Sequence, residues 1–236
     1  MMFKLSLLCL LSSSIASASA LLHLRDAGSR CDLTNAEMNL PLNQSVLIAP
    51  SVGPSYIGVA VGVQNYTCTA STGTWTNVGA VAELFDISCL YGEPEFLNMS
   101  QIAYQMWELM PPTEPILNLI NYFAAFRASM VLGQHYFVQS PTVTGLSPKW
   151  DFTSASLAGH ADAFVIGAKA GDMPSPNGPS AVDWLMLNNV QGSLAKQVFR
   201  INTVGGMPPT SCAPGANPIS VKYASAYWLF NSTVSV

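Results

Sequence analysis

The stretch YIGVAVGVQNYTCT, residues 56–69, is built from small and β-branched apolar residues and has the composition of a long β-strand. Its second half places Gln64, Asn65 and Tyr66 inside this apolar run. Successive side chains of a strand point to opposite faces, so Gln64 and Tyr66 share one face and Asn65 lies on the other. Buried amide and phenol groups need hydrogen-bond partners. We therefore expect the face of Gln64 and Tyr66 either to line a polar pocket or to bond neighbouring backbone.

Further apolar runs of strand length recur on both sides of this stretch, between segments rich in Gly, Pro, Ser and Asn. The order of these runs around one helical region predicts a mainly β fold, a single-domain β-sandwich or barrel with a helical insertion near residues 100–132. The predicted strands are Val46–Ile48, Tyr56–Thr69, Val78–Ile87, His135–Val138, Ala163–Ala168, Val182–Leu187, Lys196–Val204 and Ile219–Phe230.

The helical region has two parts. Apolar residues recur at helical intervals in Gln101–Met110, two prolines follow, and a second helical run is predicted over Glu114–Leu132. The second run is apolar enough to raise the question of a membrane span. It contains Asn118, Asn121 and Arg127, however, and such residues are costly in lipid. We predict a helical hairpin packed on the sheet and no membrane span.

The first twenty residues, MMFKLSLLCLLSSSIASASA, combine a basic start at Lys4, an apolar core and a small-residue cleavage site that ends at Ala20. This order predicts a secretory signal peptide over residues 1–20. The apolar core is shorter than the about 20 residues that span a bilayer. We expect a secreted, extracellular protein whose mature chain, residues 21–236, forms one mainly β domain.

Cysteines and glycosylation motifs fit this secretory route. Removal of the signal peptide leaves four cysteines, which in an oxidising compartment predict two disulfides with three possible connectivities. They are Cys31, Cys68, Cys89 and Cys212. We expect N-linked sugars at Asn43, Asn98 and Asn231, whereas a fourth acceptor motif, at Asn65, lies inside the strand of residues 56–69.

Composition excludes some functions and leaves others open. Charged residues make up 9% of the chain and the net charge is −4, which argues against a nucleic-acid partner because such partners call for clustered Lys and Arg. No Gly-x-Ser-x-Gly nucleophile motif occurs, and the Asp and Glu residues are scattered, so a glycosidase pair cannot be located. His135, His160 and Asp162 could supply metal ligands, but their spacing has no tight ligand signature. We expect neither a metal nor a cofactor.

The stretch FRINTVGG, residues 199–206, carries an arginine between apolar neighbours. In a strand, Arg200 and Asn202 share one face. A buried guanidinium must be paired, or must bind an anionic or polar ligand. Pairing is the more common fate of a buried charge, and the candidate partners are Asp151, Asp162 and Asp183.

Seven short stretches of the mature chain together resemble the sequences of one protein family. They are GVQNYTC (62–68), VGAVAELFD (78–86), GQHYF (133–137), PKWDF (148–152), VDWLML (182–187), FRINTVGG (199–206) with Cys212 downstream, and VKYASAYWLF (221–230). Together they resemble a domain-of-unknown-function family of secreted fungal and some bacterial proteins, whose members often carry the label malate dehydrogenase. The resemblance implies a compact, secreted, mainly β domain and brings no established catalytic residues. Within these motifs we expect the ligand-binding residues to be Gln64, Tyr66, His135, Trp150, Arg200 and Asn202.

The dehydrogenase label does not suit this sequence. An NAD-dependent dehydrogenase calls for a strand, a G-x-G-x-x-G loop and a helix in βαβ order, and the chain has no such motif. We expect a non-catalytic binding protein for a small polar ligand or carbohydrate, acting at a fungal surface or host interface. The alternatives are a secreted hydrolase acting on carbohydrate or a small ester, and a disulfide-stapled structural surface protein.

Overall fold

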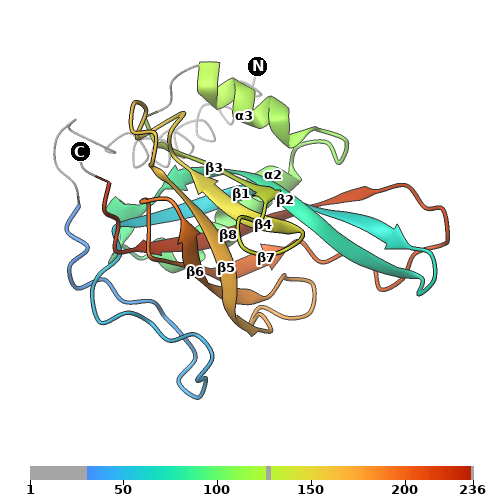
Figure 1. Cartoon of the computed structure of the whole chain (residues 1–236), viewed down its shortest axis with the longest axis horizontal. Helices are drawn as coiled ribbons and strands as arrows, with labels where there is room; N and C mark the ends of the chain where they lie inside the picture. The colour runs from blue at the N-terminus through green and yellow to red at the C-terminus, as the bar shows by residue number, and fades with distance from the viewer. Residues whose placement is uncertain (1–30, 126–128, 235–236) are drawn as a thin grey trace, which may run out of the picture. The chain divides into compact units, whose positions relative to one another are not determined.

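A computed structural model describes residues 31–125 and 129–234, and residues Leu33–Val236 form one compact unit. Eight antiparallel strands close into a barrel in which each strand pairs with the next and the last pairs with the first (Figure 1). The predicted mainly β class is confirmed, and the barrel is the form that the chain takes. The strands are β1 (Tyr56–Thr69), β2 (Thr74–Asp86), β3 (Val131–Gln139), β4 (Leu146–Asp151), β5 (Phe164–Met173), β6 (Trp184–Gln191), β7 (Gln197–Gly205) and β8 (Ile219–Phe230).

The predicted signal peptide at residues 1–20 lies outside the described residues. It therefore stays a prediction, as does the start of the domain at residue 21.

The strand predicted at Val46–Ile48 is wrong, because this segment has no strand structure. The side chain of Gln44 takes the place of a partner strand. Its Oε1 accepts hydrogen bonds from the backbone N–H groups of Val46 (2.9 Å) and Leu47 (2.7 Å), and its Nε2 donates to the carbonyl of Leu47 (2.9 Å). Three backbone groups of the segment are thus satisfied without a sheet.

Strand β4 is absent from the sequence prediction. Its sequence, LSPKWD, contains Pro148 and Lys149 and has no clear period of two. It pairs with β3 along its whole length and with β5 over Lys149–Asp151. Pairing on both sides, which the local sequence does not show, makes this segment a strand.

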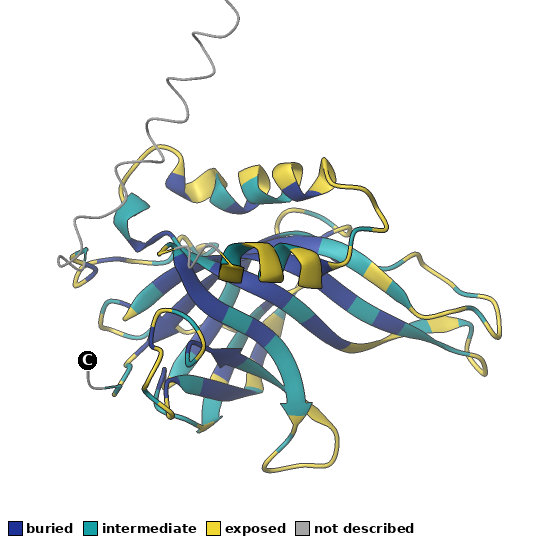
Figure 2. Cartoon of the chain, turned by 90° about the horizontal axis from the view of Figure 1, so that it is seen from above, coloured by how far each residue is buried: buried dark blue, intermediate teal, exposed yellow. Residues whose placement is uncertain are grey.

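Two helices, α2 (Met99–Glu108) and α3 (Ile116–Ala125), form the insertion between β2 and β3. They lie on the outside of the barrel with exposed outer faces (Figure 2). The predicted helical run to Leu132 is wrong at its end, because Val131 and Leu132 begin β3 and Leu132 is buried in the barrel core. Within the two described ranges, no helix is long and apolar enough to cross a membrane.

Helix α2 is attached to the barrel through Trp107. This side chain is buried, and its Nε1 donates a hydrogen bond to the backbone oxygen of Gly62 on β1 at 3.0 Å. Lys222 on β8 closes the C-terminal end of the same helix, since its Nζ donates to the carbonyls of Trp107 (2.8 Å) and Met110 (2.7 Å). A cation is favoured at this end of a helix dipole. These contacts hold α2 over the outer face of β1.

Small residues on the inner face of β1 make room for tyrosines of β8. Gly58 lies opposite Tyr227 and Gly62 opposite Tyr223, and both tyrosine rings are fully buried. A narrow eight-stranded barrel is filled by its own inward side chains, and small residues facing large ones let them fit. The rest of the core around these rings is largely apolar and includes Leu84, Leu132, Phe152, Leu187, Val198 and Leu229.

The four predicted disulfide cysteines are confirmed. Cys68 and Cys212 form one bond, with Cα atoms 5.9 Å apart, which joins the end of β1 to the loop before β8. Cys31 and Cys89 are also disulfide-bonded.

The three predicted glycosylation sites, Asn43, Asn98 and Asn231, are exposed. Asn65 is half-buried, and its Oδ1 accepts a hydrogen bond from Ser220 at 2.7 Å. Exposure is what a sugar acceptor requires, so the three sites stay open to modification, and glycosylation itself stays a prediction.

Candidate functional site

Six polar or charged side chains lie together on the inner face of the barrel wall. Residues opposite each other on paired strands share a face, so the register identifies the inner face. Arg200 lies opposite Tyr227, and His135 lies opposite Trp150. We call the six residues the inner polar cluster: Gln64, Tyr66, His135, Arg200, Tyr223 and Tyr227.

Gln64 and Tyr66 are both buried. The hydroxyl of Tyr66 donates to the backbone oxygen of Gly206 at 2.7 Å, and Oε1 of Gln64 accepts from Asn77 at 3.1 Å. The Nε2 atom of Gln64 is buried and has no hydrogen-bond partner. Of the two expectations for this face, backbone bonding therefore holds for Tyr66, while Gln64 keeps an unused donor inside the barrel.

Tyr223 and Tyr227 bring two more hydroxyl groups into the cluster, 3.4 Å apart. Burial raises the pKa of Tyr223 well above its ordinary value, and the neighbouring Tyr227 raises it further. The charge of Arg200 and the amide of Gln64 act in the opposite direction, although Nε2 of Gln64 forms no hydrogen bond. Tyr223 thus places Gln64 and Arg200 in one electrostatic neighbourhood.

Arg200 is half-buried and makes one hydrogen bond, from its Nε to the backbone oxygen of Asp183 at 3.0 Å. The predicted alternative of an ion pair with an aspartate is wrong for the described part of the chain, where no carboxylate lies within ion-pair distance of its guanidinium. Asp151, one of the candidates, pairs with Lys149 instead. Both terminal nitrogens of Arg200 are therefore unpaired among the described residues.

The positive charge of Arg200 acts on the interior. Burial raises the pKa of Tyr66, and the nearby Asn77 and Arg200 offset part of this rise, while Asp183 adds to it. Asp183 is exposed as a residue, but partial desolvation of its carboxyl group and the neighbouring Asp172 raise its pKa. Arg200 and Asp183 thus act on Tyr66 in opposite directions.

His135 is buried and neutral. Its ring stacks on Trp150, with ring centroids 4.6 Å apart and an angle of 13° between the planes. Its Nδ1 lies 3.0 Å from the backbone oxygen of Lys149, so Nδ1 carries the proton and Nε2 is an acceptor. Burial lowers the pKa of His135 to about 3, the hydrogen bond to Lys149 offsets part of the shift, and Arg200 adds to it. No residue in the described ranges bonds Nε2.

Two of the predicted site residues behave differently. Trp150 lines the barrel core beside Tyr227, and its Nε1 is a second buried donor without a partner. Asn202 does not join the cluster through any hydrogen bond of the described residues. It has a positive φ of 50° at a bulge between Ile201 and Val204, which breaks the alternation that would have placed it beside Arg200.

The two tyrosines of β8 are absent from the sequence prediction. Tyr223 and Tyr227 are four residues apart in VKYASAYWLF, a spacing that puts both on one face of a strand. That spacing was the available signal, but only barrel closure shows that this face is the inner one.

A second polar network lies on the outer face of β2, β3 and β4. We call it the outer polar cluster, and it consists of Glu83, Gln134, Tyr136, Lys149 and Asp151. Glu83 is 1% exposed, and its Oε2 accepts a hydrogen bond from Gln134 at 3.3 Å. Burial raises the pKa of Glu83 to about 7, and the bond from Gln134 offsets only part of that rise.

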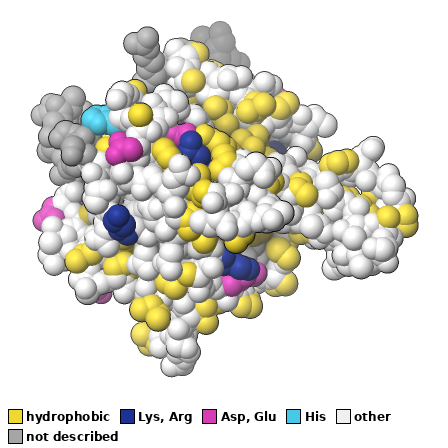
Figure 3. Space-filling view, viewed as in Figure 1, with side chains coloured by type: hydrophobic (Ala, Val, Ile, Leu, Met, Phe, Trp, Pro, Cys, Tyr) yellow, Lys and Arg dark blue, Asp and Glu magenta, His cyan; other side chains and the backbone are white. Residues whose placement is uncertain are grey.

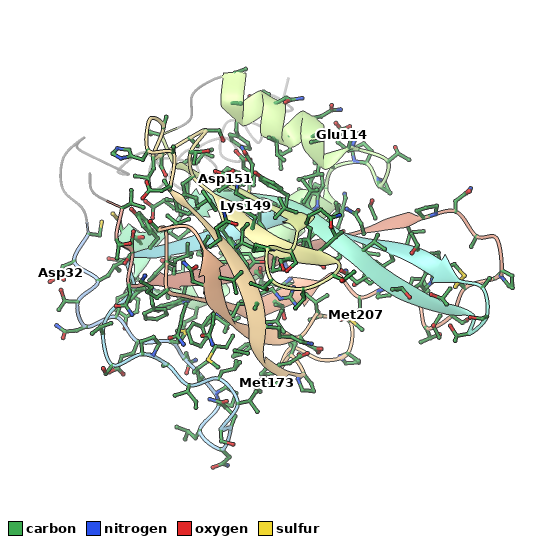
Figure 4. The ribbon with its side chains drawn as sticks, viewed as in Figure 1. Asp32, Glu114, Lys149, Asp151, Met173 and Met207 are labelled. Carbon is green, nitrogen blue, oxygen red and sulfur yellow. A yellow bond between two sulfur atoms is a disulfide. The ribbon has the colours of Figure 1, made fainter. Side chains whose placement is uncertain are left out.

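Asp151 has a full set of partners in this outer cluster. It accepts from Tyr136 at 2.6 Å, pairs with Lys149 at 2.7 Å and accepts two bonds from Thr153. Burial alone would raise the pKa of Asp151, but the bonds from Lys149, Thr153 and Tyr136 outweigh it and lower the pKa to about 2. Figure 4 shows Lys149 and Asp151 next to each other on the barrel wall. Because its charges are mutually satisfied, this cluster suits a structural role better than ligand binding.

Charged side chains are few on the molecular face drawn in Figure 3 and are scattered among uncharged ones. Over residues 31–125 and 129–234, no three His, Cys, Asp or Glu side chains are grouped so that they could hold a metal ion.

A family model with the description Protein of unknown function (DUF3455) matches residues 49–231. This range contains all eight strands and both helices, and the match confirms the resemblance to a domain-of-unknown-function family. Comparison with curated proteins and with solved structures found no match.

Proposed function

Because the chain belongs to the family described as Protein of unknown function (DUF3455), which assigns no activity, we propose a function from the inner polar cluster. The protein is a secreted, non-catalytic binding protein that binds a small polar ligand or carbohydrate through the inner polar cluster. It acts at a fungal surface or a host interface. Arg200 is the residue on which binding depends.

One observation carries this proposal: hydrogen-bonding groups in the cluster and on the adjoining Trp150 are unused. Gln64 and Trp150 each keep a buried donor without a partner, and the Nη atoms of Arg200 have none in the described part of the chain. Such groups are rare in folded proteins because each costs about 1–3 kcal/mol when unpaired. A bound polar ligand would satisfy them together.

The state of His135 favours binding over hydrolysis. A general base needs an available lone pair, a pKa near the working pH and, in most triads, an orienting carboxylate. The pKa of His135 is lowered to about 3, and its Nδ1 bonds a backbone oxygen. His135 is therefore better suited to accept a hydrogen bond from a ligand than to take up a proton.

The extracellular setting is supported by the pattern of residues 1–20 and by the disulfide between Cys68 and Cys212. Disulfides persist mainly in oxidising compartments, and a closed barrel leaves no free sheet edge to aggregate. Both features suit a protein that persists outside the cell.

A thermal-shift screen on protein secreted from a eukaryotic host tests the proposal. The panel contains neutral sugars, sugar acids, small organic acids and amino sugars. At a ligand concentration about 100 times Kd, linkage predicts stabilisation by about 2.7 kcal/mol, which a melting curve resolves. We expect at least one compound to raise the melting temperature of the wild type and not that of Arg200→Ala.

The matched control is Lys196→Ala. Lys196 is an exposed cation between β6 and β7, with no charged side-chain partner in the described part of the chain. This variant loses the same charge but should keep the ligand response. A panel that shifts neither the wild type nor the control, or a shift that survives in Arg200→Ala, contradicts the proposal.

A further inference from the structure

We propose that the ligand is a small hydroxylated carboxylate, a sugar acid or a hydroxy acid, whose carboxylate binds the terminal nitrogens of Arg200. This inference rests on the proposed function and names the chemical class of its ligand. It follows from the kinds of hydrogen-bonding group that the inner polar cluster leaves unused.

The unused hydrogen-bonding groups on the inner face are mostly donors. They are the Nη atoms of Arg200, Nε2 of Gln64 and Nε1 of Trp150. A neutral sugar offers about as many donors as acceptors through its hydroxyl groups, whereas a carboxylate offers acceptors only. An excess of donors therefore selects for a carboxylate.

The charges around the cluster also favour a carboxylate ligand. His135 is neutral, and the effect of Arg200 on Tyr66, Tyr223 and His135 shows that its charge reaches the interior. The opposing charge of Asp183 belongs to an exposed residue, and the neighbouring Asp172 is paired with Lys169 at 2.6 Å.

The outer polar cluster adds little to this field, since Lys149 and Asp151 neutralise each other there. Glu83 belongs to the outer face as well, and its pKa of about 7 keeps it largely protonated below neutral pH.

The geometry of Arg200 favours a carboxylate over a dianion such as phosphate. Its Nε is occupied by the carbonyl of Asp183, so the two terminal nitrogens are left, and they match the two oxygens of one carboxylate. A phosphate dianion would call for a second cation, and the other described cation that the register places on this face, Lys169, is already paired with Asp172. One guanidinium balances one carboxylate.

The acceptor atom Nε2 of His135 indicates that the ligand also carries a hydrogen-bond donor. Nε2 of His135 holds a lone pair and has no partner in the described ranges. Only a donor can satisfy it, and a hydroxyl group on the ligand is such a donor. A hydroxyl beside a carboxylate describes both a sugar acid and a simple hydroxy acid.

Isothermal titration with matched probes tests this assignment: galacturonate against galactose, and lactate against propionate. We expect galacturonate to bind the wild type at least about tenfold more tightly than galactose, since a charged hydrogen bond at a desolvated site is worth roughly 1.5–3 kcal/mol. Lactate and propionate show whether a hydroxy acid without the sugar ring suffices. Arg200→Gln should lose most of the preference for galacturonate, and Lys196→Ala should retain it.

Gln64→Glu supplies a second variant that keeps the size of the side chain and repels a carboxylate. It should weaken the binding of galacturonate more than that of galactose, because only galacturonate carries the charge that is repelled. If galactose binds as tightly as galacturonate and Arg200→Gln affects both equally, the carboxylate assignment is wrong while the proposed binding function stands. If no probe of the titration or of the screening panel binds, both are wrong.

Discussion

Glu83 and His135 lie one register step apart on the paired strands β2 and β3, and they face opposite sides of the barrel wall. Burial raises the pKa of Glu83 to about 7 and lowers that of His135 to about 3. The two residues therefore affect stability with opposite dependence on pH.

We predict that the free energy of unfolding is nearly independent of pH between about 4.5 and 6.5. Folded Glu83 keeps a proton that the unfolded chain releases, so its contribution falls as pH rises through this range. His135 stays unprotonated in the folded state, whereas in the unfolded chain it binds a proton below its ordinary pKa. Its contribution to stability therefore falls as pH decreases. The titration of Asp151 changes the free energy of unfolding only below its ordinary pKa of 3.8. Urea unfolding at pH 4.5, 5.5 and 6.5 provides the measurement.

The variant Glu83→Gln separates the two contributions. It removes the titration of Glu83 and keeps a side chain that can bond Gln134. Stability should then rise with pH by up to about 1.4 kcal/mol per unit across the same range, because one site with a full difference in protonation gives that slope. A flat profile in this variant would show that His135 titrates normally.

Gly62→Ala should destabilise the barrel by more than about 2 kcal/mol, the range of core overpacking. A Cβ at Gly62 would collide with the backbone oxygen of Val81 and with Ala82, neither of which can move without disturbing β2. Gly58→Ala is the matched control on the same inner face. Its Cβ would meet Cδ1 of Leu132 at 3.1 Å, a flexible side-chain end. Equal chemical-denaturation midpoints for the two variants would contradict the packing described for β1.

Trp107→Ala should cost about 3–5 kcal/mol, the usual range for truncating a buried aromatic side chain. The indole both packs against the barrel and donates to the carbonyl of Gly62. Trp107→Phe keeps most of the packing and loses the hydrogen bond, so it should cost about 1–2 kcal/mol less than the alanine variant does. Limited proteolysis supplies an independent readout, and cleavage within residues 99–125 should increase in Trp107→Ala first. Cleavage that begins elsewhere would mean that this tryptophan does not anchor the insertion.

Removal of the Cys68–Cys212 disulfide in a double Ser variant should lower stability by about 2–5 kcal/mol. The bond links residues 144 positions apart, and a long closed loop restricts the unfolded chain strongly. Binding of galacturonate by the folded variant should be unchanged, because the bond lies beyond the inner polar cluster at the end of β1. Loss of binding at a temperature where the variant is fully folded would place the disulfide in the site.

The sequence predicts this fold best where a strand carries its own pattern. The bounds of β1 and β8 agree with the prediction because each strand contains a long apolar run, buried over eight consecutive residues. Strand β4 lacks that pattern and depends on its neighbours for pairing. At Val46–Ile48, the side chain of Gln44 bonds the backbone in place of a sheet.

The sequence predicted some residues of the candidate site and missed others, depending on whether the local pattern singles them out. Gln64 and Arg200 stand out locally, as polar groups in apolar strands, and the structure places both on the inner face. Tyr223 and Tyr227 become part of the site only when β8 pairs with β1 and closes the barrel. Asn202 is displaced by a bulge in β7. A bulge of one extra residue cannot be predicted from the alternation of side chains in the sequence.

The Cys68–Cys212 bond also has a consequence for the lifetime of the chain after damage. A single cut by a protease anywhere between these cysteines, for example in the loop between β3 and β4, leaves both fragments tied together by the sulfur bridge. Such a nicked molecule would migrate as one species on a non-reducing gel and separate only after treatment with a thiol. In an environment rich in proteases, cleavage of one loop would therefore not separate the protein into two molecules.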